Sequence, residues 1–253
     1  MNQVKIRKLV FGEGRPKICV PVTGRTREEI ALRTAELKAA KPDLAEWRAD
    51  WYEEVFGREK LEATLAWLRE ELGELPLLVT FRTREEGGEQ NVSPEDYAAF
   101  LRTVLMSGQA DLIDVELFRG EELLRDICRE AKAQGVKVIA SSHDFEKTPA
   151  KEEILARLIR MQDCGADLLK LAAMPQDAAD VLTLLSATLE MSEKYAKQPV
   201  VTMSMGAKGA VSRLAGEVFG SAMTFGSAGV ASAPGQVSVP ELKMALEVLR
   251  QGK

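Results

Sequence analysis

VKVIASSHD (136–144), PAKEEILARLIRMQDCG (149–165) and ADLLKLAAM (166–174) follow one another in the middle of the chain and decide its fold. The first and third are short runs of β-branched and aliphatic residues, which is typical of buried strands. The stretch between them places its apolar residues at helical spacing. A strand, a helix and a second strand predict a parallel pair, because parallel neighbours need a long crossover connection. The fold class expected from this unit is α/β.

The same alternation extends outward in both directions. Six further strand-like runs are KICVPVTG (17–24), DLAEWRAD (43–50), PLLVTFRT (76–83), DLIDVELF (111–118), QPVVTMSMG (198–206) and SAMTFGSA (221–228), and helical patterns include 27–40, 94–107 and 240–253. Eight strand–helix units in 253 residues predict a (β/α)8 TIM barrel. The alternative, a doubly wound sheet, needs a glycine-rich fingerprint after its first strand, and GRTREE (24–29) is not one.

We expect a single domain spanning residues 1–253, with residues 4–14 forming an N-terminal β-hairpin that closes the barrel floor. The net charge of −5 argues against nucleic acid or an anionic membrane as a main partner. No run approaches the roughly 18 apolar residues of a membrane span. The three cysteines are widely spaced, without a CxxC motif, and favour reduced thiols and a cytoplasmic location. With one histidine in the chain, a histidine-rich metal site is excluded.

Lys170 is an unusual residue for the middle of a buried strand. Its own face of the run carries Leu168 and Ala172, because successive side chains alternate between faces. Burial among aliphatic groups disfavours the ammonium form, so we expect the pKa of Lys170 to be lowered and its neutral amine to act as a nucleophile. From the strand alone, a structural lysine that reaches the rim or pairs with an acid is an equal alternative.

His143 ends the strand-like run that precedes the run of Lys170. Barrel enzymes place their chemistry at the C-terminal ends of the strands, and imidazole is a natural general acid and base near neutral pH. A lone histidine more often has a structural role. Its position beside Lys170 favours a proton shuttle that works with a lysine nucleophile.

Charged residues also recur at the ends of three other strands. They are Glu46 and Arg48 in EWRAD, Arg82 and Glu86 in FRTREEGGE, and Asp114 and Glu116 in IDVELF. Charges on successive barrel strands are costly unless they pair around a polar cavity. We interpret the first four as the lining of a ligand cavity, whereas Asp114 and Glu116 are compatible with ion pairs that fill the lumen.

Two segments after the last strands complete the predicted mouth. MSMGAKGAVSR (203–213) leads from Met203 and Met205 into a short helix that carries Arg213, whose forked guanidinium suits a carboxylate. GSAGVASAPGQ (226–236) consists of small residues, with Ser232 and Gln236 as its hydrogen-bonding side chains. We interpret the second segment as a mobile lid, although an ordinary loop has the same composition.

The order EWRAD, TFRTREEGG, SSHDF, LLKLAAM, MSMGxxGxxSR and SAPGQ resembles the type I 3-dehydroquinate dehydratase family, from about Lys17 to the C-terminus. The resemblance implies a (β/α)8 barrel, usually a homodimer. It also implies a lyase that converts 3-dehydroquinate to 3-dehydroshikimate and water, the third step of the shikimate pathway to chorismate and the aromatic amino acids. Neither a metal nor an organic cofactor is implied.

The same resemblance implies roles for individual residues. Lys170 forms a Schiff base, His143 is the general acid and base, and Glu86 orients and polarises the histidine. The implied substrate-binding residues are Arg213, Ser232 and Gln236 at the carboxylate end, Glu46, Arg48 and Arg82 at the ring hydroxyls, and Met203, Met205 and Phe225 in the apolar wall. Pro21 stands where the family commonly has serine, from which we expect an effect on affinity rather than on chemistry.

Two alternatives remain open at this point. A different Schiff-base barrel, such as a class I aldolase, would usually bind a phosphate through backbone amides after the seventh and eighth strands. A barrel that senses the ligand without turnover would retain the pocket, although such copies should have lost Lys170 or His143.

Overall fold

The computed structural model describes residues 2–229 and 235–251. Its central element is a ring of parallel strands: β3 (Lys17–Val22), β4 (Leu44–Arg48), β5 (Leu77–Thr80), β6 (Leu112–Glu116), β7 (Lys137–Asp144), β8 (Leu168–Ala173), β9 (Val200–Ser204) and β10 (Met223–Ser227). Consecutive strands from β3 to β9 pair in register, and β10 pairs with β3. All eight predicted strands are confirmed, each somewhat shorter than its apolar run.

The ring is closed between β9 and β10 by a short contact. Val200 and Ser221 form an isolated parallel bridge, and the Ala222 N–H donates to the Val200 carbonyl at 2.7 Å. On the edge opposite β3, β10 also pairs with the short strand β11 (Val237–Ser238). The sheet is therefore a barrel, as predicted, and the doubly wound alternative is wrong.

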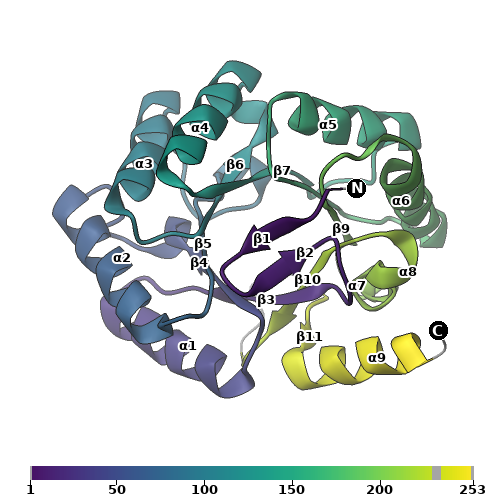
Figure 1. Cartoon of the computed structure of the whole chain (residues 1–253), viewed down its shortest axis with the longest axis horizontal. Helices are drawn as coiled ribbons and strands as arrows, with labels where there is room; N and C mark the ends of the chain where they lie inside the picture. The colour runs from purple at the N-terminus through teal and green to yellow at the C-terminus, as the bar shows by residue number, and fades with distance from the viewer. Residues whose placement is uncertain (1, 230–234, 252–253) are drawn as a thin grey trace.

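Helices surround the barrel in an outer ring (Figure 1). They are α1 (Arg27–Ala40), α2 (Arg58–Leu72), α3 (Pro94–Ser107), α4 (Glu121–Gln134), α5 (Lys151–Asp163), α6 (Ala178–Glu190), α7 (Ala210–Leu214), α8 (Gly216–Phe219) and α9 (Val239–Gln251). Short helical turns η1 (Ala49–Trp51), η2 (Arg84–Glu86) and η3 (Leu117–Arg119) follow β4, β5 and β6, and a π-helical turn η4 (Met191–Tyr195) extends α6. The predicted bounds of α1 and α3 agree with the structure, since Thr26 and Ser93 cap the two helices.

Strand alternation divides the apolar side chains into two cores. Outward-facing residues such as Trp47 pack under the helices, whereas Leu44, Leu78 and Leu168 belong to a separate cluster inside the barrel. Small and aliphatic side chains fill the lower lumen, so the barrel is a packed core below its mouth.

The N-terminal hairpin pairs β1 (Val4–Ile6) with β2 (Leu9–Phe11) in antiparallel register. Ile6 and Phe11 are buried in the same cluster as the lower lumen residues, and Figure 1 shows the hairpin lying across the centre of the ring of strands. The predicted closure of the barrel floor is confirmed. A ligand would therefore have to enter the lumen from the C-terminal ends of the strands.

Candidate active site

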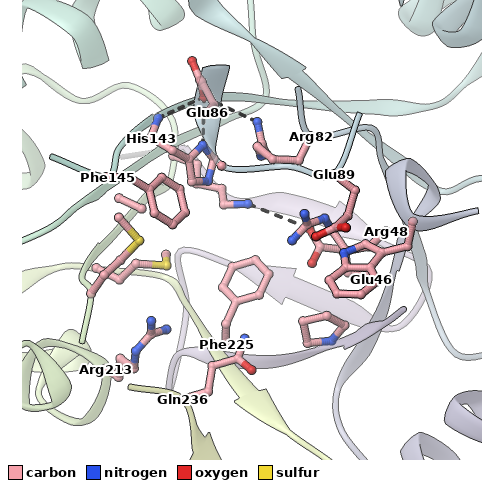
Figure 2. Close-up of a pocket in the computed structure, with 17 residues that line it drawn as sticks. Glu46, Arg48, Arg82, Glu86, Glu89, His143, Phe145, Arg213, Phe225 and Gln236 are labelled. Atoms are coloured by element: carbon pink, nitrogen blue, oxygen red, sulfur yellow. Dashed lines mark hydrogen bonds and ion pairs between the residues drawn. The ribbon is translucent and has the colours of Figure 1, made fainter. Parts of the chain in front are cut away.

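A pocket of about 210 Å³ opens at the C-terminal mouth of the barrel (Figure 2). Its lining consists of Pro21, Glu46, Arg48, Trp51, Arg82, Glu86, Gly87, Glu89, His143, Phe145, Lys170, Ala172, Met203, Met205, Arg213, Phe225 and Gln236. Eleven of the twelve predicted site residues are in this set. The twelfth, Ser232, lies outside the described residues. Segments far apart in the sequence thus converge on one cavity large enough for a small substituted ring.

Lys170 is 4% exposed and projects from β8 into the lumen. Its Nζ donates to Asp114 Oδ2 at 3.2 Å, lies 3.9 Å from Glu46 Oε1, and sits 4.5 Å from the centre of the Phe225 ring. The expected burial is confirmed, but the expected purely aliphatic surroundings are wrong. The reason is that alternate strands of a barrel contribute side chains to the same layer, so β4, β6 and β10 place two carboxylates and a ring around the amine.

His143 is joined to Glu86 by two contacts to the same oxygen. The His143 backbone N–H donates to Glu86 Oε2 at 3.0 Å, and Nδ1 lies 2.9 Å from that atom. Because Oε2 is already an acceptor, the geometry favours an Nδ1–H donor and leaves Nε2 as the basic nitrogen. Glu86 therefore has the position expected of a group that orients the imidazole.

The pKa values of this pair are shifted toward the neutral forms. Burial, together with nearby Arg82 and Lys170, holds the pKa of His143 well below its ordinary value. Burial and the neighbouring Glu116 raise the pKa of Glu86 to about 8. Both groups are thus shifted toward their uncharged forms, and an uncharged imidazole is available as a base.

Two glycines shape the loop that presents Glu86. Gly87 has a φ of +84°, and a Cβ there would overlap the ring of Phe145. A Cβ at Gly88 would overlap the carbonyl oxygen of Arg82. Glycine at position 87 lets the loop after β5 pack on Phe145, and glycine at position 88 lets the loop fold back on Arg82. Both contacts keep Glu86 close to His143.

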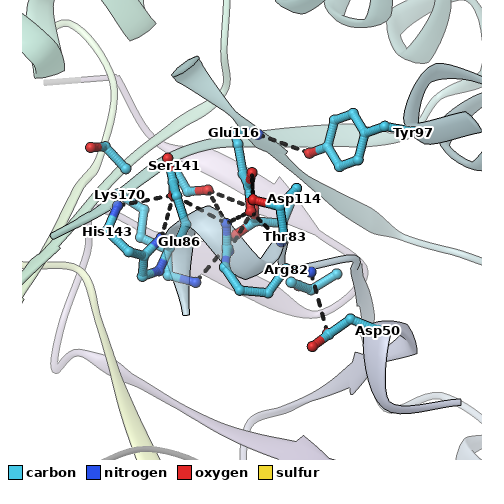
Figure 3. Close-up of polar contacts among 12 residues, drawn as sticks. Asp50, Arg82, Thr83, Glu86, Tyr97, Asp114, Glu116, Ser141, His143 and Lys170 are labelled. Carbon is cyan, nitrogen blue, oxygen red and sulfur yellow. Dashed lines mark hydrogen bonds and ion pairs between the residues drawn. The ribbon is translucent and has the colours of Figure 1, made fainter. Parts of the chain in front are cut away.

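Arg82 is the centre of a buried ion-pair network (Figure 3). Its guanidinium lies 2.7 Å from Glu116 and 2.8 Å from Asp114, and it donates to Ser141 at 3.0 Å. Coulombic attraction from these acids raises the pKa of Arg82 against the opposing effect of burial. Arg82 therefore has both of the roles considered for the strand charges: it lines the pocket, and it forms ion pairs inside the barrel with Asp114 and Glu116.

Asp50 holds the other arginine of the mouth and was missed in the sequence. Its carboxylate receives both arms of Arg48 at 2.8 Å, and it also accepts the backbone N–H groups of Arg82 and Glu89 at 3.2 Å each. The side chain is fully buried. The last residue of EWRAD thus ties the end of β4 to the loop that carries Glu86.

Arg213 approaches the pocket from α7, and Figure 2 shows it with Gln236 on the side away from Glu86 and His143. Ser212 accepts the Ser204 N–H at 2.8 Å and so anchors α7 to β9. Arg213 is 2% exposed, and burial lowers its pKa to about 10. A buried cation of this kind is stabilised by an incoming anion, which suits a carboxylate.

The apolar wall between these polar groups is formed as predicted by Met203, Met205 and Phe225, all buried. The sequence interpretation missed five lining residues, namely Trp51, Gly87, Glu89, Phe145 and Ala172. Four of them lie inside the motifs FRTREEGGE, SSHDF and LLKLAAM, and Trp51 directly follows EWRAD, so weighing every residue of these motifs and its next neighbour would have found them. Pro21, noted in the sequence, also lines the pocket and lies beside Glu46 in the sheet.

Within residues 2–229 and 235–251, no cluster of three or more His, Cys, Asp or Glu side chains has a geometry suited to a metal ion. In the same part of the chain, no helix combines the length and the apolar character needed to cross a membrane.

Comparison with known proteins identifies close relatives. The sequence model of the type I 3-dehydroquinase family matches residues 18–253. The 3-dehydroquinate dehydratases of Syntrophotalea carbinolica and Bacillus licheniformis are 52% and 51% identical, each alignment covering 98% of both chains. The crystal structure of type I 3-dehydroquinate dehydratase from Clostridium difficile, solved with covalently modified comenic acid, is 48% identical, with a TM-score of 0.96 over 100% of this chain and 99% of the other.

Proposed function

The chain belongs to the type I 3-dehydroquinase family, and from this premise we propose that it removes water from 3-dehydroquinate to give 3-dehydroshikimate through a Schiff base on Lys170. The observation that carries the proposal is the convergence of three groups in one pocket. They are the buried amine of Lys170, the His143–Glu86 pair and the guanidinium of Arg213. The activity makes the protein a lyase of aromatic amino acid biosynthesis.

The first step is attack by the neutral amine of Lys170 on the C3 ketone. Loss of water from the resulting adduct gives an iminium, which withdraws electrons from the adjacent carbon. A proton on C2 becomes acidic as a result. His143 Nε2 removes it, and the charged imidazole is stabilised by its hydrogen bond from Nδ1 to Glu86 Oε2.

The second step expels the C1 hydroxyl from the enamine. His143 returns its proton to the departing oxygen, so that water leaves and the imidazole becomes neutral again. Hydrolysis of the remaining iminium by a second water molecule frees the product and regenerates Lys170. One water is consumed and two are released, which balances the net loss of one.

Substrate binding is divided among the other lining residues. Arg213 binds the carboxylate, and Gln236, with Ser232 from the undescribed segment, closes on the same end. Arg48 and Glu46 bind ring hydroxyls, while Arg82 contributes through the face that it turns to the pocket. Correct orientation by such contacts can lower the activation free energy by roughly several kcal/mol.

We also infer that the chain acts as one domain and that two copies form a homodimer through α7 and α9. Val211, Met244, Val248 and Leu249 are 40–67% exposed there and line one apolar groove with Leu214, Ala215 and Ala245. Contiguous apolar surface of this kind marks interaction sites on proteins. Sedimentation velocity should give a dimer for the natural chain and a monomer for Val248→Glu; a monomeric natural chain would exclude this assembly.

The cytoplasm is the expected location, because Cys19, Cys128 and Cys164 are all free thiols in the structure. Cell fractionation would test this inference. Recovery of the protein outside the cytoplasm, with the cysteines oxidised, would contradict it.

The proposed activity is tested by following the enone absorbance of 3-dehydroshikimate after mixing the purified protein with 3-dehydroquinate, with EDTA present throughout. We expect multiple turnovers in EDTA, since the iminium is the electron sink. Carbon–carbon cleavage products would indicate an aldolase instead. Binding of 3-dehydroquinate by calorimetry without any turnover would indicate a ligand sensor.

A further inference from the structure

Asp114 is the closest charged neighbour of the Lys170 amine, and its two oxygens have different partners. Oδ2 accepts from Lys170 Nζ at 3.2 Å. Oδ1 accepts from Ser141 at 2.6 Å and lies 2.8 Å from the Arg82 guanidinium. The carboxylate is completely buried. Ser141 and Arg82 thus hold one oxygen in place, while the other oxygen points at the amine of Lys170.

Glu116 provides an internal comparison, because it lies two residues further along β6 and faces the same lumen. It accepts from Arg82 at 2.7 Å and from the Thr83 backbone and hydroxyl at 2.9 and 2.7 Å. These contacts fix the loop after β5, and no contact joins Glu116 to Lys170 among the described residues. Both acids therefore pair with Arg82, but of the two only Asp114 contacts the amine of Lys170.

We propose that Asp114 is the counter-ion of Lys170 whenever its nitrogen is cationic, in the resting ammonium form and in the iminium, and that it accepts the N–H of the iminium. Because it requires a lysine iminium, this role rests on the proposed function. Amine and iminium share the same nitrogen, and both cationic forms keep at least one N–H. An acceptor fixed by Ser141 and Arg82 sets the direction of that N–H, and with it the face that the iminium plane presents to His143.

The groups around Lys170 are consistent with a single dominant counter-ion. Glu46 from β4 is further away at 3.9 Å, and the same oxygen already accepts from Thr80 at 2.8 Å. The remaining charged or titratable neighbours are Cys19, Arg48, Arg82, Glu86 and His143, on or just after β3, β4, β5 and β7. Burial raises the pKa of the Cys19 thiol, so this group stays neutral. Phe225 of β10 contributes a ring face and no charge.

Removal of the Asp114 charge has a predictable sign. A nearby anion favours the protonated forms of both the amine and the imine, so its loss lets each lose its proton at lower pH. In a profile of trapped adduct against pH, the acidic limb reports deprotonation of the amine and the alkaline limb reports deprotonation of the iminium. Both limbs should move to lower pH. An opposite charge at this distance typically changes a pKa by about one to three units.

The test compares Asp114→Asn with Glu116→Gln, since each variant removes one ion pair from Arg82 and only the first touches Lys170. Cyanoborohydride reduces iminium ions but not neutral imines, and intact-mass measurement across pH records the trapped fraction. We expect Asp114→Asn to move both limbs by about one to three pH units, and Glu116→Gln to leave them near those of the natural chain. Equal shifts in the two variants, or none in Asp114→Asn, would overturn the assignment.

Two further arms keep the result decisive. If Asp114→Asn does not fold, Ser141→Ala loosens the carboxylate without removing its charge, and it should shift both limbs in the same direction by less. The absence of that shift would then overturn the role of Asp114. If the natural chain itself forms no adduct with 3-dehydroquinate, the proposed function fails, which separates the two outcomes.

Discussion

At the floor of the barrel three aspartates occupy equivalent positions, each just before a strand. Asp43, Asp111 and Asp167 accept the backbone N–H of Ile18, Leu77 and Val138, at 2.7, 2.9 and 3.0 Å. Each is also paired with a basic side chain, and each keeps 15–27% of its side chain exposed. These charges stay hydrated and satisfy backbone donors at the strand ends.

At the mouth the charges are arranged differently. Lys170, Arg82, Glu86, Asp114 and Glu116 are all 5% exposed or less. Glu86 Oε1 is buried and has no hydrogen-bond partner among the described residues. Like charges are also crowded there, since Glu116 contributes to the raised pKa of Glu86. The groups have lost most of their hydration, and their pairing restores only part of it.

The contrast indicates that the floor aspartates stabilise the fold, whereas the buried charged residues of the mouth serve the reaction. Floor aspartates join neighbouring strands, so their removal should lower stability without altering the chemistry. Burial and the mouth charges together shift His143 toward its uncharged form, so removal of these charges should alter the chemistry, in addition to any loss of stability from a broken ion pair.

Apart from replacement of Lys170 itself, the largest expected effect is at the mouth, in His143→Ala. The variant should still form the imine, since that step needs the amine of Lys170, but elimination should slow by the ~10²–10⁴-fold typical of a positioned acid–base group. Steady-state kinetics and the mass of the accumulated adduct would measure both. Normal turnover in this variant would remove His143 from the mechanism.

Arg213→Ala should weaken binding by about 1.5–3 kcal/mol, roughly 10- to 150-fold in KM, because a charged hydrogen-bonding group is lost. Arg213→Lys should recover only part of this, since ammonium cannot make a forked contact. Steady-state kinetics of the two variants and the natural chain give kcat and KM for the comparison. Natural kinetics in Arg213→Ala would exclude the carboxylate clamp.

At the floor, Asp111→Ala should reduce the free energy of unfolding by about 1–3 kcal/mol, because the Leu77 N–H loses its side-chain acceptor and the guanidinium groups of Arg7 and Arg69 each lose one of theirs. The kcat at 25 °C should not change. Asp126→Ala breaks an exposed pair with Arg129 and serves as the control, with little effect expected. A loss of kcat in a folded Asp111→Ala protein would break the proposed division between floor and mouth.

The smallest effect is expected for the stability of Glu86→Gln. The folded-state pKa of Glu86, about 8, lies above its ordinary value, so its contribution to stability is present at low pH and is lost as the pH rises through 8. Glutamine should remove this loss, so the stability of the variant should fall less than that of the natural chain as the pH rises toward 8. Glu85→Gln, largely exposed, is the control. Turnover should lie between that of the natural chain and that of His143→Ala; an unchanged pH dependence of stability would contradict the raised pKa.

Much of the fold was predictable because its signals are local. Strands follow from short apolar runs, and the ends of α1 and α3 follow from the caps Thr26 and Ser93. The positions of His143 and Lys170 were informative for the same reason, since a polar residue inside a buried strand is visible in the sequence alone.

The partners of these residues were not predictable in the same way. Contact between Lys170 and Asp114 depends on the stagger of β6 and β8 around the barrel, which no local pattern encodes. Because these contacts cannot be read from the sequence, the aliphatic environment expected for Lys170 was wrong. The packing of Phe145 on Gly87 is also a long-range contact, although both residues belong to recognisable motifs.

The central claim is that Lys170 forms the covalent intermediate. Borohydride added during turnover of 3-dehydroquinate should convert the iminium to a stable amine, and peptide mass mapping should find the added mass on Lys170 in the natural chain. Lys170→Ala should carry no adduct and lose nearly all turnover, while still binding the substrate through Arg213. Labelling of another lysine, or of none while the product is being formed, would contradict the account.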